Sequence, residues 1–250
     1  MADPVALQGF VDKWLAREPE IALLEVFCPK PQRVLFRSWG ALRSELVEVV
    51  FEVSDANVAR TKLAWWVADL AAAERGRHPL TRALFAQAES SRTTSSHWHA
   101  LLSAALGALE SDHAPASIDA AVAELQPLAQ AIGDIEGALF HCHSSAAAIA
   151  LHLQVERNLR GLVGIYAERA RLPAEWRNTA EAGAVRRFAS ALLAYSAGSA
   201  KGSLLTTFHQ LLDQQRLRQL ARHGKPQSAL AVAPWRGLML GWRAARLAVG

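Results

Sequence analysis

Apolar residues recur at steps of three and four positions along nearly the whole chain, which is the spacing of one helix face. Two polar stretches, residues 89–97 and 110–117, lack this period, and the second contains a proline. We therefore predict loops at these two places and helices elsewhere. The expected helices cover residues 4–17, 19–28, 31–53, 55–75, 79–88, 97–109, 118–132, 134–160, 162–170, 173–182, 184–197, 202–223 and 227–247.

Several of these helices have termini with residues that favour a start or a stop. Asp55 precedes an apolar run and occupies the place of an N-cap. Pro79 suits the first turn of the helix that begins there, and Gly224 followed by Pro226 is the usual order at a helix C-terminus. Because neither loop is long enough to separate two domains, we expect one domain over residues 1–250.

Composition strengthens the helical prediction. The 250 residues include 49 Ala and 35 Leu, against 16 Val, 6 Ile and 7 Thr. Ala and Leu lose little side-chain entropy in helices, whereas strands favour β-branched residues. An all-α fold is therefore expected, and a parallel sheet that carries a nucleotide is strongly disfavoured.

Charges of both signs are mixed along the chain. Lys and Arg number 27 against 23 Asp and Glu, a net charge of +4 without runs of five like charges, so nucleic acid is not an expected partner. The two cysteines, Cys28 and Cys142, are too few for a disulfide framework and indicate a reducing compartment. Since the chain also lacks a leader-like N-terminus and an apolar run of about 18 residues, we expect a cytoplasmic protein.

One group of metal-binding residue types, His141-Cys142-His143, falls inside an expected helix. Neighbouring helical residues point about 100° apart, so these side chains do not converge on one ion without ligands from elsewhere. The same geometry applies to His97 and His99. The spacing of the Gly, Ser, Cys and His residues also matches no phosphate loop or catalytic triad.

A pair of tryptophans, Trp65 and Trp66, lies in another expected helix. Trp66 shares a helix face with Leu63, and core packing is the simplest interpretation of that face. About a dozen residues later the chain carries His78-Pro79 before an aliphatic turn. This order of a paired Trp and then His-Pro is more specific than helical periodicity.

A second specific segment, residues 153–161, reads Leu-Gln-Val-Glu-Arg-Asn-Leu-Arg-Gly and follows a stretch rich in Ala and Ser. Residues 171–175 then read Arg-Leu-Pro-Ala-Glu. Together with the tryptophan segment and with Phe-Val-Asp-Lys-Trp at 10–14, these segments resemble the squalene/phytoene synthase family. The resemblance extends over nearly the whole chain and rests on the order and spacing of the segments.

The resemblance implies a single-domain helical bundle around a central cavity, the isoprenoid-synthase type of all-α fold. Members of this family join two prenyl diphosphates head to head in isoprenoid (squalene and phytoene) biosynthesis. Their reaction needs Mg²⁺, which neutralises the leaving diphosphate and is bound by hard carboxylate oxygens. Two facing helices each supply an Asp-x-x-x-Asp pair, because i, i+4 spacing places both carboxylates on one helix face.

This chain departs from the family pattern at both metal-binding motifs. Gly161 and Ile165 occupy the places of the two aspartates on the second helix, and Leu46 and Val50 occupy those on the first. Without these acids, Mg²⁺ binding and turnover are expected to fall by orders of magnitude. The resemblance therefore points to a catalytically degenerate member of the family.

Glu48 and Glu52 keep an i, i+4 spacing close to the first motif and are weak candidates for a metal site. Arg43 aligns with a family arginine, but the two glutamates do not have the spacing from Arg43 that the family's aspartates would have. The alternative interpretation is that they lie on a solvated helix face. No cofactor is expected for a degenerate protein, whereas an active enzyme would require Mg²⁺.

Arg43 and Arg160 match arginines that contact diphosphate in the family, and Arg157 lies one helical turn before Arg160. The resemblance thus implies that these three side chains form a metal-free anion or diphosphate site. Ion pairing with acidic residues of the chain itself is the equally weighted alternative.

The C-terminal segment from Trp235 to Arg246 is basic and amphipathic, with Trp242 seven residues after the first Trp. One hypothesis is peripheral contact with a membrane surface, which would make the cytoplasmic protein membrane-peripheral. The alternative is that this helix packs against its own bundle.

These observations support three hypotheses of function. The first is a squalene/phytoene synthase-like pseudoenzyme that retains an isoprenoid or anion-binding cavity, or binds a protein partner in an assembly role. The second is an active prenyltransferase that condenses two prenyl diphosphates. The third is a helical scaffold whose cavity is filled by large side chains. The sequence does not decide whether the chain is an enzyme, although the missing acids argue against catalysis.

Overall fold

The computed structural model describes residues 4–72, 76–111, 114–163, 173, 181–196, 202–225 and 232–248. Across these ranges the regular elements are all helical and strands are absent, which confirms the all-α prediction. The helices are α1 (Pro4–Arg17), α2 (Glu20–Leu24), η1 (Glu25–Phe27), η2 (Lys30–Gln32), α3 (Arg33–Phe51), α4 (Ala56–Ala71), α5 (Pro79–Phe85), η4 (Ala88–Arg92), α6 (Ser95–Glu110), α7 (Ile118–Phe140), α8 (Ala146–Val163), α9 (Glu181–Tyr195), α10 (Leu204–His223) and α12 (Pro234–Ala248).

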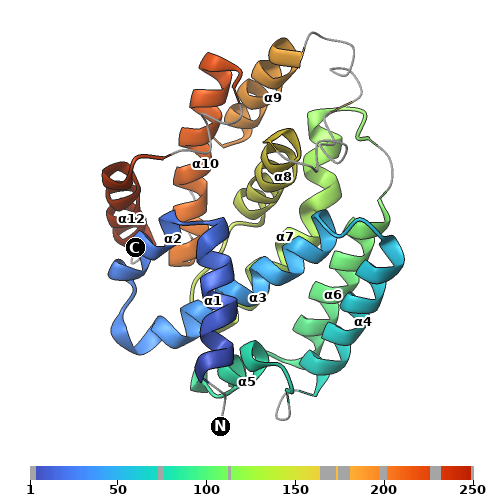
Figure 1. Ribbon diagram of the computed structural model, residues 1–250, viewed down its shortest axis with the longest axis vertical. Coiled ribbons are helices and arrows are strands. Elements are labelled where there is room, and N and C mark those ends of the chain that lie inside the picture. The colour runs from blue at the N-terminus through green and yellow to red at the C-terminus, as the bar shows by residue number, and fades with distance from the viewer. Residues whose placement is uncertain are drawn as a thin grey trace.

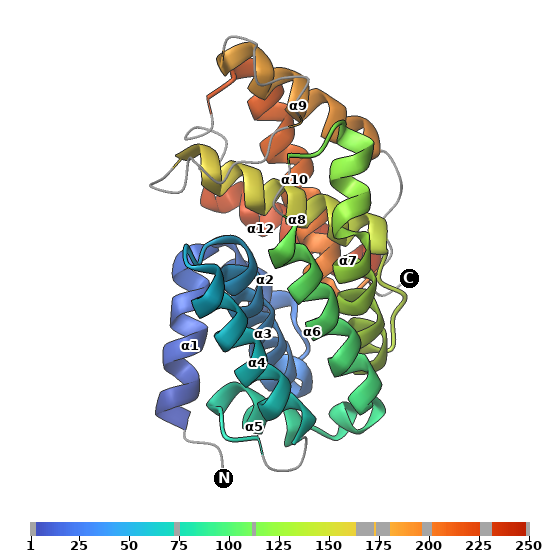
Figure 2. The same cartoon turned by 90° about the vertical axis from the view of Figure 1, so that its right-hand side faces the viewer.

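The helices form two groups that α7 connects. In Figures 1 and 2, α1 and α3–α6 occupy one end of the molecule, and α8, α9 and α10 occupy the other. The long helix α7 packs against α6 in the first group and against α8 and α9 in the second. Buried apolar side chains from α1 through α12 form one continuous core across both groups.

The last helix, α12, packs on α2 and α10 at the side of the molecule. Two glycines face α2 and η1: a Cβ atom on Gly237 would lie 3.0 Å from the Leu23 side chain of α2, and one on Gly241 would lie 3.0 Å from the Phe27 ring of η1. Small side chains therefore bring α12 close to α2. This leaves the opposite face of α12 toward solvent.

The predicted helix caps are observed where the described residues include them. The Asp55 carboxylate accepts hydrogen bonds from the backbone N–H groups of Asn57 and Val58, at the start of α4. Pro79 is the first residue of α5, and Gly224 ends α10 in the left-handed conformation with φ 63°. These signals depend only on nearby residues, which is why the sequence reveals them.

The predicted helix break at Gly133 is wrong. A single helix, α7, continues through Gly133 to Phe140, and the chain turns at His141, whose φ is 53°. Gly133 allows the loop after α7 to pass close to the helix, because a Cβ atom there would lie 3.1 Å from the Ser144 carbonyl oxygen in that loop. Cys142 consequently lies in that loop and not in a helix, so the helical argument about the His141–His143 segment does not apply.

Two further segments differ from the prediction. The helix expected at 19–28 is the short α2 followed by the 3₁₀ turn η1, and the loop expected at 89–97 contains η4 and the start of α6. Thr94 caps α6 in a reciprocal capping box with His97, so this histidine has a structural partner. The helices expected at 162–170 and 173–182 lie almost entirely outside the described residues.

Candidate functional site

Many charged side chains are buried where α3, α7, α8 and α10 meet the turn between α1 and α2. Carboxylates and guanidinium groups are rarely buried unless they are paired, so such a group is a candidate site. We call it the polar cluster. Its members are five acids, two arginines and two histidines: Glu18, Glu20, Glu136, Glu156, Asp213, Arg43, Arg216, His152 and His209.

Glu136 of α7 accepts hydrogen bonds at both carboxylate oxygens and is completely buried. Arg43 and Trp39 of α3 donate to Oε1 at 3.1 and 3.2 Å. Three hydroxyl groups donate to Oε2 at 2.6–2.8 Å: those of Ser144, Ser203 and Thr206. The carboxylate thereby joins α3, α7, the loop after α7 and the start of α10.

These contacts determine the protonation of Glu136. Burial by itself raises the pKa of this carboxyl, but the charge of Arg43 and the three hydroxyl donors outweigh burial and hold the pKa below its ordinary value. Because the donors already occupy both oxygens, Glu136 is a structural carboxylate and is poorly suited to act as a general base.

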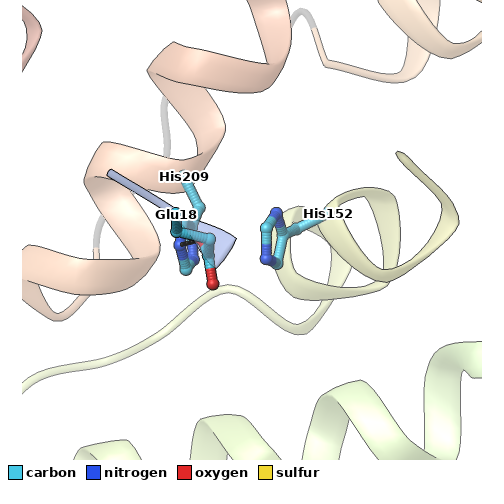
Figure 3. A group of neighbouring side chains, drawn as sticks. All are labelled: Glu18, His152 and His209. Atoms are coloured by element: carbon cyan, nitrogen blue, oxygen red, sulfur yellow. Dashed lines mark hydrogen bonds and ion pairs between the residues drawn. The ribbon is translucent and has the colours of Figure 1, made fainter. Parts of the chain in front are cut away.

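Two imidazoles form the second part of the polar cluster. The rings of His152 on α8 and His209 on α10 are stacked, with centroids 3.8 Å apart and an interplanar angle of 8°. His209 Nε2 lies 2.8 Å from Glu18 Oε2, and His152 Nδ1 lies 2.8 Å from Asp213 Oδ2. Figure 3 shows the His152 ring facing His209 and Glu18.

Electrostatics disfavour a charged imidazolium at His209. Burial lowers the pKa of His209, and the neighbouring His152 lowers it further, against the opposing effect of Glu18. Among the described residues, Glu18, His152 and His209 are the group of potential metal ligands whose donor atoms all lie within 4.8 Å of one another. This is the place in the described structure where protein ligands could hold a metal ion.

A cavity of about 240 Å³ lies beside the polar cluster. Ser203 and Leu205 lie on its wall, and Ser203 also donates to Glu136. Among the described residues, the lining is mostly apolar and contains no charged side chain: Phe27, Cys28, Pro29, Gln32, Phe36, Phe140, Cys142, Gly202, Ser203, Leu204, Leu205, Ala245 and Ala248.

Both cysteines of the chain line this cavity as free thiols. Burial raises the pKa of the Cys28 thiol to about 11, with Glu25 adding to the effect. Burial also raises the pKa of the Cys142 thiol. Protonated thiols are weak nucleophiles, so the cysteines contribute to the cavity as small apolar side chains.

Of the predicted anion-site arginines, Arg43 and Arg157 do not line the 240 Å³ cavity. Arg43 is buried and bonded to Glu136, as described above. Arg157 lies 2.9 Å from Glu124 and 5.5 Å above the Phe51 ring, so its charge faces a carboxylate and an aromatic ring. The side chain of Arg160 lies outside the described residues.

The weak metal candidates, Glu48 and Glu52, face two basic side chains of α1. Arg17 lies 2.8 Å from Glu48 and 2.5 Å from Glu52, and Lys13 lies 2.9 Å from Glu48. These contacts form an ion-pair network between α1 and α3, and this network explains the i, i+4 spacing of the two acids.

The region beside Arg43 is filled by side chains. Leu46 and Val50, which occupy the family's aspartate positions, are buried there. Two cavities lined by Arg43 measure about 10 and 20 Å³, no more than the space of a single water molecule. Leu46 and Val50 therefore do not line the 240 Å³ cavity.

The tryptophan and His-Pro segments come together at a third place. His78 caps α5, and its ring lies 4.7 Å from the Trp66 ring and 5.6 Å from the Trp65 ring. The Phe10 ring of α1 lies 4.3 Å from His78. Trp66 is buried and Trp65 is 43% exposed, so core packing accounts for Trp66 and only partly for Trp65.

Sequence reasoning missed the acids and histidines at the centre of the polar cluster. The available signal is a polar residue on an otherwise apolar helix face, as with Glu136 in Ile-Glu-Gly-Ala-Leu and His209 after Phe208. That signal marks burial, but it does not identify partners on other helices.

Comparisons with protein-family models, with curated proteins and with solved structures find no match. The family resemblance stated above thus remains an inference from the sequence segments.

Proposed function

We propose that this chain is a squalene/phytoene synthase-like binding protein that no longer condenses prenyl diphosphates and holds one neutral, isoprenoid-type chain. The family part of the proposal rests on the order of the sequence segments. The ligand part rests on the cavity between α10, α12 and the turn after α2.

The single observation that carries the ligand class is that the described residues lining that cavity carry no charge. Burial of a diphosphate there would remove several charges from water without a cation to compensate them, which is strongly unfavourable. An apolar chain with at most a hydroxyl or carbonyl group suits the lining, because Gln32 supplies a side-chain amide for a hydrogen bond.

Size favours one chain over two. The cavity of about 240 Å³ is smaller than the roughly 300–1,000 Å³ of pockets that take drug-sized ligands. Two prenyl chains side by side, as head-to-head condensation requires, do not fit a space of this size. The alternative function, an active prenyltransferase, therefore gains no support from this cavity.

The helix that lines the cavity also suggests how an apolar ligand arrives. Ala245 and Ala248 of α12 line the cavity, whereas Trp235 and Trp242 on the same helix are exposed. We propose that this outer face lies on a membrane surface and takes the ligand from the lipid phase. Within the described residues, no helix has the length and apolar character needed to cross a bilayer.

The test is equilibrium binding of the prenyl alcohol farnesol, followed by intrinsic tryptophan fluorescence and by calorimetry. We expect saturable binding of one farnesol per chain, and no comparable binding of farnesyl diphosphate in the absence of metal. Ala245→Phe fills the cavity and should abolish farnesol binding. The matched control, Ala123→Phe on the exposed face of α7, should leave it unchanged.

Preferential binding of the diphosphate, or equal farnesol binding by Ala245→Phe and wild type, would overturn the proposed ligand class. Thermal unfolding of both variants, measured alongside, separates loss of binding from loss of folding.

A further inference from the structure

We propose that Glu18, His152 and His209 form a binding site for one divalent transition-metal ion, with zinc as the best match. This site goes beyond the proposed function and does not depend on it. The three residues come from the turn after α1, from α8 and from α10, and all three side chains are buried. Two imidazoles and one carboxylate are a donor set that binds zinc and leaves a fourth position open.

The potential donor atoms of the three residues lie close together. The donor atoms lie within 4.8 Å of one another, and Glu18 Oε2 is 2.8 Å from His209 Nε2. In a tetrahedral zinc site, neighbouring donor atoms are about 3.4 Å apart. Imidazole lone pairs lie in the ring plane, and the planes of the two stacked rings are nearly parallel (Figure 3). Metal binding therefore requires one ring to turn about its side-chain bonds until a nitrogen of each ring faces the ion.

A second carboxylate positions one of the ligands. Asp213 Oδ2 lies 2.8 Å from His152 Nδ1, and Asp213 is completely buried. Since an ionised carboxylate only accepts hydrogen bonds, Nδ1 carries the proton and the Nε2 lone pair of His152 is available to a metal. This carboxylate–histidine arrangement is the usual support of a metal-bound imidazole.

The local charge also suits a dication. The arginines around the two histidines are engaged with other acids, at distances between 2.5 and 3.7 Å: Arg43 with Glu136, Arg216 with Glu20 and Glu156, and Arg17 with Glu48 and Glu52. The carboxylates that touch the imidazoles, Glu18 and Asp213, together carry two negative charges. One divalent cation matches that charge.

There is also space next to the ligands. A cavity of about 20 Å³ is lined by Glu18, His152 and His209, and this is enough for one water molecule as the fourth ligand. Because residues 18, 152 and 209 are far apart in the chain, a bound ion would tie the N-terminal turn to α8 and α10. We therefore infer that the metal stabilises the contact between the two helix groups.

The test uses the 250-residue chain, stripped of metal by chelator and then loaded with zinc or cobalt. Elemental analysis after gel filtration should find one zinc per chain, and Co²⁺ should give the visible absorption of a tetrahedral complex. Zinc should raise the Tm. Mg²⁺ should produce none of these effects, because it prefers oxygen ligands.

Variants identify the ligands. Glu18→Gln, His152→Asn and His209→Asn should each lose the bound zinc, and Asp213→Asn should weaken zinc binding about 10–100-fold. The control His141→Asn/His143→Asn removes the exposed histidines around Cys142 and should keep one zinc per chain. Circular dichroism of each metal-free variant checks that it is folded.

Less than a tenth of an equivalent of zinc in the wild type would overturn the proposal. So would full zinc retention in His152→Asn and His209→Asn, or loss of zinc in the His141→Asn/His143→Asn control. Failure of farnesol binding, by contrast, would leave the metal site intact.

Discussion

Glu136 shows how much of the fold depends on single residues. Its carboxylate is buried among five donors from α3, from the loop after α7 and from the start of α10. Removing the negative charge leaves the Arg43 guanidinium buried without its counter-ion, which is one of the costly single changes in a protein interior.

We expect Glu136→Gln to lower the free energy of unfolding by about 3–5 kcal/mol at neutral pH. Urea denaturation followed by circular dichroism measures this difference. The exposed acid Glu110, 3.6 Å from Arg60, provides the control, and Glu110→Gln should cost less than about 1 kcal/mol. Equal stability of the Glu136→Gln variant and the wild type would contradict the assigned role.

The Glu136 carboxyl should also make the stability of the protein depend on pH. The folded pKa of Glu136 is held below the ordinary value of 4.5, so its contribution to stability is fully present above that value and is lost as pH falls through the folded pKa. The unfolding free energy of the wild type should therefore fall more steeply in acid than that of Glu136→Gln. If the free energies of unfolding of the two proteins changed in parallel with pH, this prediction would be contradicted.

At the scale of elements, local signals are readable from sequence and cross-helix contacts are not. Asp55 and Gly224 mark helix ends because each acts on its own backbone. Gly133 resembles a helix end but accommodates the Ser144 carbonyl, a contact that depends on where the next loop returns. The partners of Glu136 are hidden for the same reason, since Ser203 and Thr206 lie far along the chain.

The packing of α1 on α3 gives a second test. A Cβ atom on Gly40 would lie 2.1 Å from the ring of buried Trp14, so Gly40→Ala forces the two helices apart. We expect a loss of about 1–3 kcal/mol in the free energy of unfolding, measured with urea. Gly9→Ala on α1 meets nothing within 4 Å and should stabilise the protein by about 0.5–1 kcal/mol. A neutral Gly40→Ala would show that α1 packs differently.

The outer face of α12 makes a prediction about membranes. Trp235 is 60% exposed and Trp242 is 47% exposed, and an arginine lies 5.0 Å from each ring. Vesicles with anionic lipid should sediment the protein, with binding that weakens as salt rises, because the helix combines apolar insertion with positive charge.

Trp235→Ser/Trp242→Ser should reduce vesicle binding at least tenfold, as measured by sedimentation at several lipid concentrations. Trp65→Ser is the matched control, because Trp65 is 43% exposed on α4 at a distance from α12 in the fold. Unchanged vesicle binding by the double variant would contradict membrane contact and favour a protein partner for this face.

At the scale of the whole molecule, the polar cluster joins the two helix groups that α7 connects. Residue 18 meets residue 209, and residue 43 meets residue 136, through buried polar contacts. The helical class was predictable from the Ala and Leu content, whereas this long-range arrangement was not, because periodicity gives helix faces without their pairing. For Arg43 the sequence left an anion site and ion pairing with the chain's own acids as equal alternatives, and the contact with Glu136 is an ion pair of the second kind.

The last prediction concerns catalysis of prenyl diphosphate condensation. Incubation with farnesyl or geranylgeranyl diphosphate and Mg²⁺ should release no pyrophosphate above the background of a heat-inactivated sample. The reason is that Leu46, Val50, Gly161 and Ile165 stand where the sequence resemblance would place metal-binding acids, and each 1.36 kcal/mol of lost transition-state stabilisation slows the reaction tenfold. Glu48 and Glu52 supply no substitute, because Arg17 and Lys13 already face them. Turnover at a rate typical of metabolic enzymes, abolished by Glu48→Gln/Glu52→Gln, would instead identify an active prenyltransferase that binds Mg²⁺ through these two glutamates.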